Sequence, residues 1–154
     1  MDLPLRQRQD ELRQLVQQRS AHPRFAAPLD PVDGRGCALN PLCGDAVALA
    51  LRLAPAVDPE APRRVEAARC GVEGCALCQA SADLLAQVIT GCSLPECQQL
   101  GTSFRALLRG QAAALPPHHP LQVFAVLERN PTRARCAALP WEALAQALGA
   151  LDAS

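Results

Sequence analysis

The sequence predicts an α+β fold, in which a small antiparallel sheet in the first half has helices packed on one face. Three observations lead to this prediction. Apolar residues of the first half form short runs bounded by proline and glycine, as strands do. From Cys75 onward, leucines recur at helical spacing. The 154 residues, 49% of them hydrophobic, suffice for one domain over 1–154, with a core over 37–151.

The first half is expected to hold one helix and two strands. Residues 3–19 repeat leucine at helical spacing and predict an N-terminal helix. Residues 20–36 contain three prolines and two glycines and predict a loop. Residues 46–53 predict a buried strand, and 63–70 predict a second strand that returns along the first. The glycine-rich residues 71–74 then predict a turn.

The second half is expected to be helical. A first helix begins at Cys75 and stops near Gly91. A second begins after Ser93, a capping residue, and runs to about Arg109. A third covers 121–129. Asn130 and Pro131 are expected to end this third helix, and a last helix is expected over 136–151.

Charge and composition exclude several classes of function. The formal net charge is +0, which offers no basic surface for nucleic acid. No apolar run approaches the roughly 18 residues of a membrane span. The sequence contains no lysine, which excludes Schiff-base and P-loop chemistry. Residues 1–19 lack the apolar centre of a signal peptide, so we expect a cytoplasmic protein, and a monomer at this size.

Eight cysteines in a chain without an export signal point to metal or sulfur chemistry rather than disulfides. The segment 40–45 reads Asn-Pro-Leu-Cys-Gly-Asp and predicts a tight turn. In an extended segment, residues two apart point to the same side, so Cys43 and Asp45 could face one ion. Thiolate and carboxylate both bind zinc. The alternative is a buried cysteine beside a solvated aspartate.

Three more cysteines are candidates for this chemistry, although each could also be structural. Cys75 opens a helix, whose N-terminus favours the thiolate. Arg135 and a helix start are expected to lower the pKa of Cys136. Cys78 forms a C-x-x-C pair with Cys75, a spacing typical of zinc ligands or a redox dithiol. The other residues of interest are interpreted as structural cysteines, solvated histidines and a core tryptophan: Cys37, Cys70, Cys92, Cys97, His22, His118, His119 and Trp141.

Three segments, in their order, resemble the motifs of the U-type iron–sulfur cluster assembly proteins, the family of the NifU N-terminal domain and IscU. They are Asn-Pro-Leu-Cys-Gly-Asp at 40–45, Gly-x-x-Gly-Cys-x-x-x-x-Ala-Ser-Ala at 71–82, and Arg-x-Arg-Cys-x-x-Leu-x-Trp-x-x-Leu at 133–144. The sequence looks closest to the SufU branch. That branch carries extra helical sequence between its second and third cysteines, as residues 90–131 do here.

The resemblance implies a compact α+β fold and a metal site formed by Cys43, Asp45, Cys75 and Cys136. In SufU-like members the metal is zinc, and the protein accepts persulfide sulfur from a SufS-type cysteine desulfurase. In the scaffold branch, the same cysteines hold iron or a transient [2Fe–2S] cluster, which is passed to acceptor proteins. Cys43 lies on a turn, and we expect it to be the persulfide acceptor.

The sequence departs from the family at two places. Cys78 stands where the family usually has serine, and this fifth thiol could exchange as a ligand or relay sulfur. Residues 22–26 match the family's early Pro-Arg-Asn-Gly segment only in part, and that segment bears on partner docking. Two alternatives lie outside this function. One is a structural zinc module that serves protein contacts, and the other is a thiol oxidoreductase that uses Cys75 and Cys78.

Overall fold

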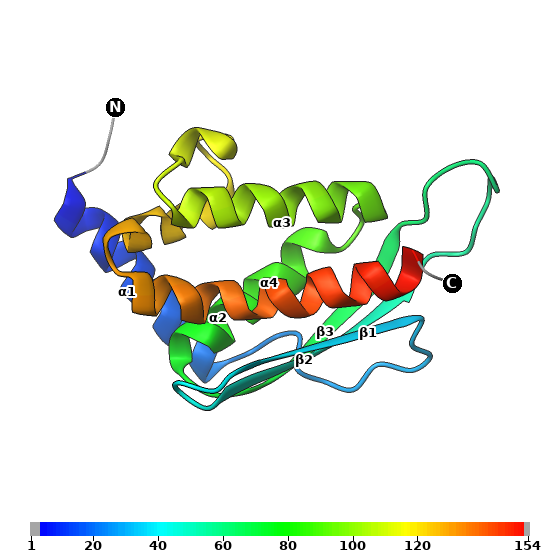
Figure 1. Ribbon diagram of the computed structural model, residues 1–154, viewed down its shortest axis with the longest axis horizontal. Helices are drawn as coiled ribbons and strands as arrows, with labels where there is room; N and C mark the ends of the chain where they lie inside the picture. The colour runs from blue at the N-terminus through cyan, green and yellow to red at the C-terminus, as the bar shows by residue number, and fades with distance from the viewer. Residues whose placement is uncertain (1–3, 153–154) are drawn as a thin grey trace.

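A computed structural model describes residues 4–152 (Figure 1). The elements run in the order α1 Leu5–Ala21, β1 Gly34–Asn40, β2 Asp45–Leu53, β3 Val65–Glu73, α2 Ala76–Ile89, α3 Leu94–Leu108, η1 Ala112–Ala114, η2 Pro120–Arg129 and α4 Pro131–Asp152, where η denotes a 3₁₀ helix. The N-terminal helix predicted over 3–19 is therefore present, although Leu3 lies outside the described residues. It extends to Ala21.

The three strands form one antiparallel sheet in the order β1-β2-β3. α2 and α4 pack on one face of this sheet, and α3 lies beyond α4, farther from the strands (Figure 1). The α+β fold with helices on one face is thus confirmed. The β1–β2 turn and the end of β3 meet at the same end of the sheet, because Asn40 pairs with Asp45 and Ala46 pairs with Glu73.

The prediction of the strands was incomplete. Residues 34–36 belong to β1 rather than to a loop, and residues 71–73 belong to β3 rather than to a turn. Gly34 and Gly36 were interpreted as loop residues, but both lie in β1. A Cβ added to Gly36 would collide with the backbone of Ala143 in α4. Glycine is present there because a helix packs directly against the strand, and not because the chain turns.

Two helix predictions were also wrong in detail. Residues 121–129 form a 3₁₀ helix that begins at Pro120. The last helix begins at Pro131, so Cys136 lies beyond its first turn. The Asn130 side chain accepts a hydrogen bond from the Arg133 N–H at 3.2 Å, as an N-cap does. Asn130 and Pro131 therefore start α4, with proline in its favoured first position.

Buried contacts fix the helices against one another. Trp141 stacks on Phe104 with ring centroids 4.8 Å apart, which confirms it as a core residue. The Ser81 hydroxyl donates to the Ala137 carbonyl at 2.6 Å and so joins α2 to α4. The buried Asp83 carboxylate pairs with Arg19 at 2.8 Å, which anchors α1 to α2. These contacts hold together the helices that carry Cys75 and Cys136.

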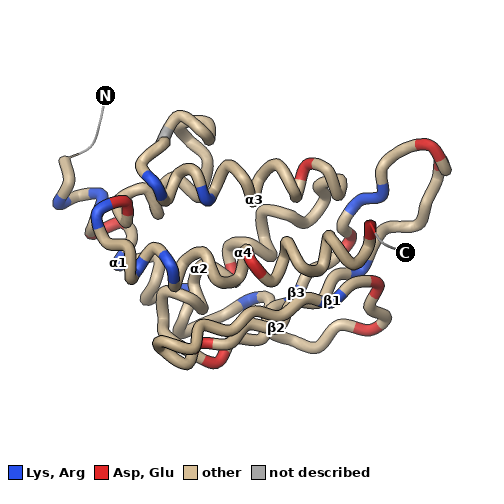
Figure 2. Tube along the Cα trace, in the orientation of Figure 1, with Lys and Arg blue, Asp and Glu red and all other residues tan. Residues whose placement is uncertain are grey.

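Residues of both charge signs occur on α1 and in the β2–β3 connection, whereas residues 110–127 carry no Arg, Asp or Glu (Figure 2). Within the described residues, no helix combines the length and apolarity that crossing a membrane requires.

Candidate metal centre

The turn between β1 and β2 places Cys43 at the end of the sheet. The Gly44 N–H donates to the Asn40 carbonyl at 2.8 Å, and Gly44 has a φ of +76°, which favours glycine. The Asn40 side-chain oxygen also accepts from the Leu42 N–H at 3.1 Å. Sequence reasoning missed this role of Asn40, although asparagine before proline is a recognised turn signal. The resulting turn leaves Cys43 exposed.

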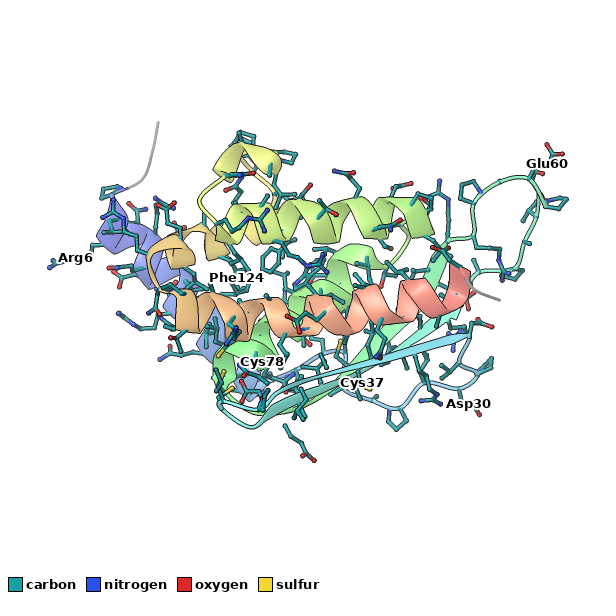
Figure 3. All side chains as sticks on the ribbon, viewed as in Figure 1. Arg6, Asp30, Cys37, Glu60, Cys78 and Phe124 are labelled. Atoms are coloured by element: carbon teal, nitrogen blue, oxygen red, sulfur yellow. The ribbon has the colours of Figure 1, made fainter. Side chains whose placement is uncertain are left out.

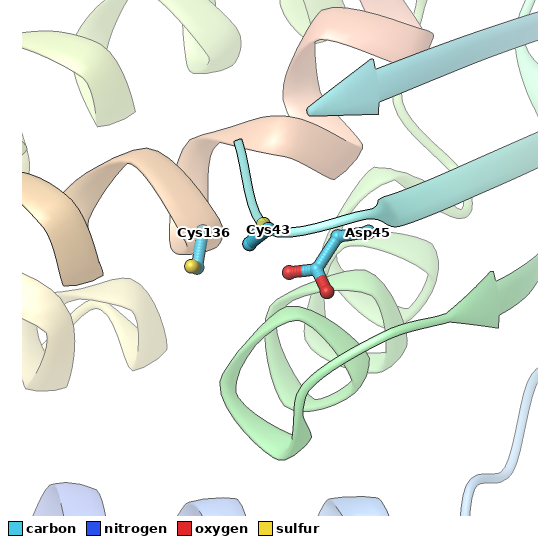
Figure 4. Close-up of side chains that lie close together, drawn as sticks. All are labelled: Cys43, Asp45 and Cys136. Atoms are coloured by element: carbon cyan, nitrogen blue, oxygen red, sulfur yellow. The ribbon is translucent and has the colours of Figure 1, made fainter. Parts of the chain in front are cut away.

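Cys43, Asp45 and Cys136 converge from two parts of the chain (Figure 4). One potential ligand atom of each lies within 4.8 Å of those of the other two. Cys43 comes from the turn, Asp45 begins β2, and Cys136 projects from α4. Three residues predicted for one site therefore lie together, although more than 90 residues separate Cys43 from Cys136.

Cys75 lies beside this group and caps α2. Its N–H donates to Asp45 Oδ1 at 3.1 Å, and its Sγ accepts from the Cys78 N–H at 3.4 Å. Cys75 is nevertheless outside the set of ligand atoms that all lie within 4.8 Å of one another, so the structure brings three of the four predicted ligands into one group and places the fourth beside it. Gly74 permits the approach of this segment, since an added Cβ would collide with the Asp45 carboxylate. The predicted start of a helix at Cys75 is therefore confirmed.

The donor set fits a metal ion. Asp45 is buried, and its Oδ2 has no hydrogen-bond partner among the described residues. A buried carboxylate oxygen without a partner costs free energy unless another group binds it. The Cys43 and Cys136 thiols lie within 4.8 Å of one oxygen of this carboxylate, and Cys75 binds its Oδ1 through the backbone N–H. Thiolates and a carboxylate in this number match four-coordinate zinc.

The pKa of Cys136 does not follow the sequence-based prediction. Burial, followed by the nearby Cys75, raises the pKa of Cys136 to about 12. The helix starts at Pro131 rather than at Cys136, and burial together with Cys75, Cys43 and Asp45 raises this pKa. Burial likewise raises the pKa of the Cys78 thiol, with a smaller effect from Cys75. Without a bound cation, these thiols favour their protonated form.

Cys78 lies near this group, and the other four cysteines lie apart from it. Cys37 lies on β1, part-way along the sheet, whereas Cys78 lies at the end that holds the site (Figure 3). Cys70 and Cys97 are buried in the core, and Cys92 is half-buried. His119 caps η2 by accepting from the Leu121 N–H at 3.1 Å, so its role is structural rather than solvated.

A shallow hollow adjoins the turn. Its volume is about 300 Å³, and it is lined by Leu39, Asn40, Pro41, Leu42, Arg135, Leu139 and Glu142. Leu39 and Leu42 are 65% and 80% exposed, among the most exposed large apolar side chains of the described chain. An exposed apolar patch of this kind is typical of a protein-docking surface.

Comparison with known sequences decides the family. The sequence profile described as "NifU-like N terminal domain" matches residues 11–153. The chain belongs to this NifU-like family. The match spans all four predicted ligands, Cys43, Asp45, Cys75 and Cys136. No curated protein sequence is significantly similar to the chain.

Solved structures share the NifU-like fold. One is assigned as an iron–sulfur cluster assembly scaffold protein for the SUF system of Fervidobacterium islandicum AW-1, at 23% identity, covering 87% of this chain and 93% of that one, with a TM-score of 0.74. Another is a nitrogen-fixing NifU-like protein (N-terminal) from Brucella abortus, at 20% identity, covering 96% and 99%, with a TM-score of 0.71. At these identities the likeness concerns the fold.

Proposed function

We propose that this NifU-like protein serves iron–sulfur cluster assembly as a SufU-like sulfur acceptor. The observation that carries the proposal is the convergence of Cys43, Asp45 and Cys136 around one point, with Cys75 beside them. These four residues would hold one zinc ion. Bound zinc would keep the ligating thiols as thiolates at neutral pH without redox chemistry of its own. The family match and the SUF-system neighbour support this role.

Cys43 is the proposed acceptor because it is exposed on the turn, whereas Cys136 is half-buried and Cys75, also exposed, is held at the N-cap of α2. Its thiolate attacks the outer sulfur of a persulfide on a SufS-type cysteine desulfurase. The sulfur–sulfur bond of the desulfurase breaks, and its cysteine leaves as a thiolate. A new persulfide forms on Cys43, so that no electrons are gained or lost overall.

The hollow beside the turn is the proposed docking surface for the desulfurase. Leu39 and Leu42 offer apolar contacts, and Arg135 and Glu142 offer charged contacts at its rim. Cys43 follows Leu42 directly, so a partner seated there would bring its persulfide to the acceptor. This placement gives Arg135 a role in recognition rather than in lowering the pKa of Cys136.

The test combines the protein with a SufS-type desulfurase and free cysteine, and follows persulfide on the NifU-like chain by mass spectrometry. The wild type and the Cys37→Ser variant should both carry sulfur, because Cys37 is exposed but lies away from the site. Cys43→Ser should lose most of it. Equal sulfur loading of Cys43→Ser would contradict the assignment of the acceptor.

A second candidate is the scaffold function, in which a [2Fe–2S] cluster is built on the same residues and passed to acceptor proteins. The open turn at Cys43 favours it, because a transferred cluster must leave the site. Asp45, an oxygen ligand among sulfurs, would weaken cluster binding and assist its release. Iron with matching acid-labile sulfide in protein purified without oxygen would favour this candidate.

A structural zinc module is a third candidate. It predicts bound zinc with no sulfur transfer, and unfolding when the zinc is removed. A cytoplasmic, monomeric protein is our expectation for each of these functions.

A further inference from the structure

Cys78 is a thiol at the site that the proposed ligand set leaves unused. It lies on the first turn of α2, and its side chain is 0% exposed. Cys75 precedes it at the N-cap position and is exposed. The Cys78 N–H donates to Cys75 Sγ at 3.4 Å, so the outer thiol is turned toward the helix end that holds the inner one.

The two cysteines can form a disulfide with little movement. Cys75 Sγ already lies 3.4 Å from the Cys78 backbone nitrogen, and a disulfide needs the two Cβ atoms to be about 3.5–4.5 Å apart. The Cys75 backbone is extended, with φ −77° and ψ 161°, and it follows Gly74 outside the helix. Cys75 can therefore approach Cys78 without breaking the hydrogen bonds of the helix.

Burial fixes the order in which the two thiols react. An external sulfur donor can meet Cys75 but not Cys78, because the Cys78 side chain is fully enclosed. Cys78 can react only with a group already attached to its neighbour. An exposed attacking thiol with a buried resolving thiol is the arrangement of a two-thiol reductant.

We propose that Cys75 and Cys78 form a dithiol that reduces sulfane sulfur to sulfide within this protein. The proposal rests on the proposed function, because its substrate is the sulfur that Cys43 accepts. One ligand atom of Asp45 lies within 4.8 Å of Cys43 Sγ, and the Cys75 N–H donates to Asp45 Oδ1 at 3.1 Å, so Cys43 and Cys75 lie on either side of one carboxylate. Sulfur on Cys43 therefore has a short path to Cys75.

The reaction has two steps. The Cys75 thiolate attacks the outer sulfur of the Cys43 persulfide, Cys43 leaves as a thiolate, and the persulfide is now on Cys75. Cys78 then attacks Cys75 Sγ, and the outer sulfur leaves as hydrosulfide with the bonding electron pair and the proton of Cys78. A Cys75–Cys78 disulfide remains. The two thiols lose two electrons, and the sulfane sulfur gains them. A dithiol reductant restores the pair.

The consequence concerns the form in which sulfur leaves the protein. Iron–sulfur clusters contain sulfide, whereas a persulfide delivers sulfur two electrons more oxidised. A chain with serine at this position would need an external reductant to act on the persulfide itself, whereas here the external dithiol acts on the Cys75–Cys78 disulfide after the sulfide has left. This chain holds those two electrons beside the acceptor.

The experiment uses the full chain without oxygen, loaded with glutathione persulfide, with excess donor removed. Acid-labile sulfide and the peptide linking Cys75 to Cys78 are then measured. The wild type should release about one sulfide for each disulfide formed. Cys78→Ser should retain its persulfide and release about tenfold less sulfide. Cys97→Ser is the matched control, because Cys97 is equally buried but lies on α3. It should behave as the wild type.

The wild-type result alone can overturn the inference. A wild-type protein that retains its persulfide and forms no Cys75–Cys78 disulfide would contradict it. Equal sulfide release from Cys78→Ser, or from Cys78→Ala where the serine variant fails to fold, also overturns it. A parallel assay replaces the chemical donor with a SufS-type desulfurase and cysteine. Sulfur transfer without sulfide there contradicts this inference alone. Sulfide from the chemical donor, without transfer from the desulfurase, contradicts the proposed function alone.

Discussion

The Asp45 carboxylate accepts a hydrogen bond from the Cys75 backbone N–H at 3.1 Å. This contact joins the start of β2 to the start of α2, two segments 30 residues apart in sequence. It orients the carboxylate so that Oδ1 is bound to the backbone and Oδ2 is left for another partner. Hydrogen bonds of this kind orient the ligands of metal sites.

Gly74 lies against the Asp45 carboxylate and leaves room for this hydrogen bond. Replacing Gly74 should therefore weaken metal binding. Gly74→Ala places a methyl group against the Asp45 carboxylate and should lower zinc affinity by about 10–100-fold. Gly71→Ala is the control, because a Cβ there meets nothing within 4 Å. Competition with a coloured zinc chelator measures both affinities. Unchanged affinity in Gly74→Ala would show that the Asp45 contact does not shape the site.

Asp45 itself is predicted to make a bound cluster labile. In Asp45→Ala, the oxygen donor among the sulfur ligands is absent, so a reconstituted [2Fe–2S] cluster should persist several times longer. Decay of its visible absorption in the presence of a chelator gives the lifetime. Asp58→Ala, in the exposed β2–β3 connection, should decay as the wild type does. A lifetime in Asp45→Ala equal to or shorter than that of the wild type would refute the role.

The exposed leucines beside Cys43 are predicted to dock the desulfurase. Leu42→Glu places a charge in the apolar contact and should weaken desulfurase binding by about tenfold or more, with zinc content unchanged. Val57→Glu is the control, because Val57 is 97% exposed in the β2–β3 connection, away from the site. Titration calorimetry measures both. If the two variants bind the desulfurase with equal affinity, the docking surface does not include Leu42.

Much of this site could be predicted from the sequence, because its residues lie in short segments with strong local signals. The turn at 40–45 and the cap at Cys75 depend on neighbours in sequence, and both form as expected. The strand β1 was missed because Gly36 has a tertiary cause, the packing of α4 against the strand. A single sequence carries no sign of that contact.

The environment of Cys136 could not be predicted for a related reason. An Asn–Pro pair can end one helix or start the next, depending on tertiary packing, and Asn130 and Pro131 start α4. The thiol thereby loses the helix N-terminus and gains burial near other thiols. Local charge, from which a lower pKa was expected, is outweighed by these long-range contacts.

The buried Cys70 should make stability depend on alkaline pH. Burial, with a smaller effect of Asp83, raises the pKa of Cys70 from 9.0 to about 12. The unfolded thiol ionises first as pH rises, so the folded state loses stability between pH 9 and 12. From pH 8 to 10, the loss from this group is on the order of 1 kcal/mol. Urea unfolding should show a smaller loss in Cys70→Ala, and an equal loss would contradict the assignment.

The most direct test of the metal centre is the content of metal and acid-labile sulfide in protein purified without oxygen. A zinc-dependent sulfur acceptor should contain about one zinc ion per chain and no sulfide, with zinc absent from a Cys43→Ser, Cys136→Ser double variant. Iron with matching sulfide would contradict the sulfur-acceptor function and favour the scaffold. Neither metal, with every thiol free or paired in disulfides, would contradict the metal centre itself.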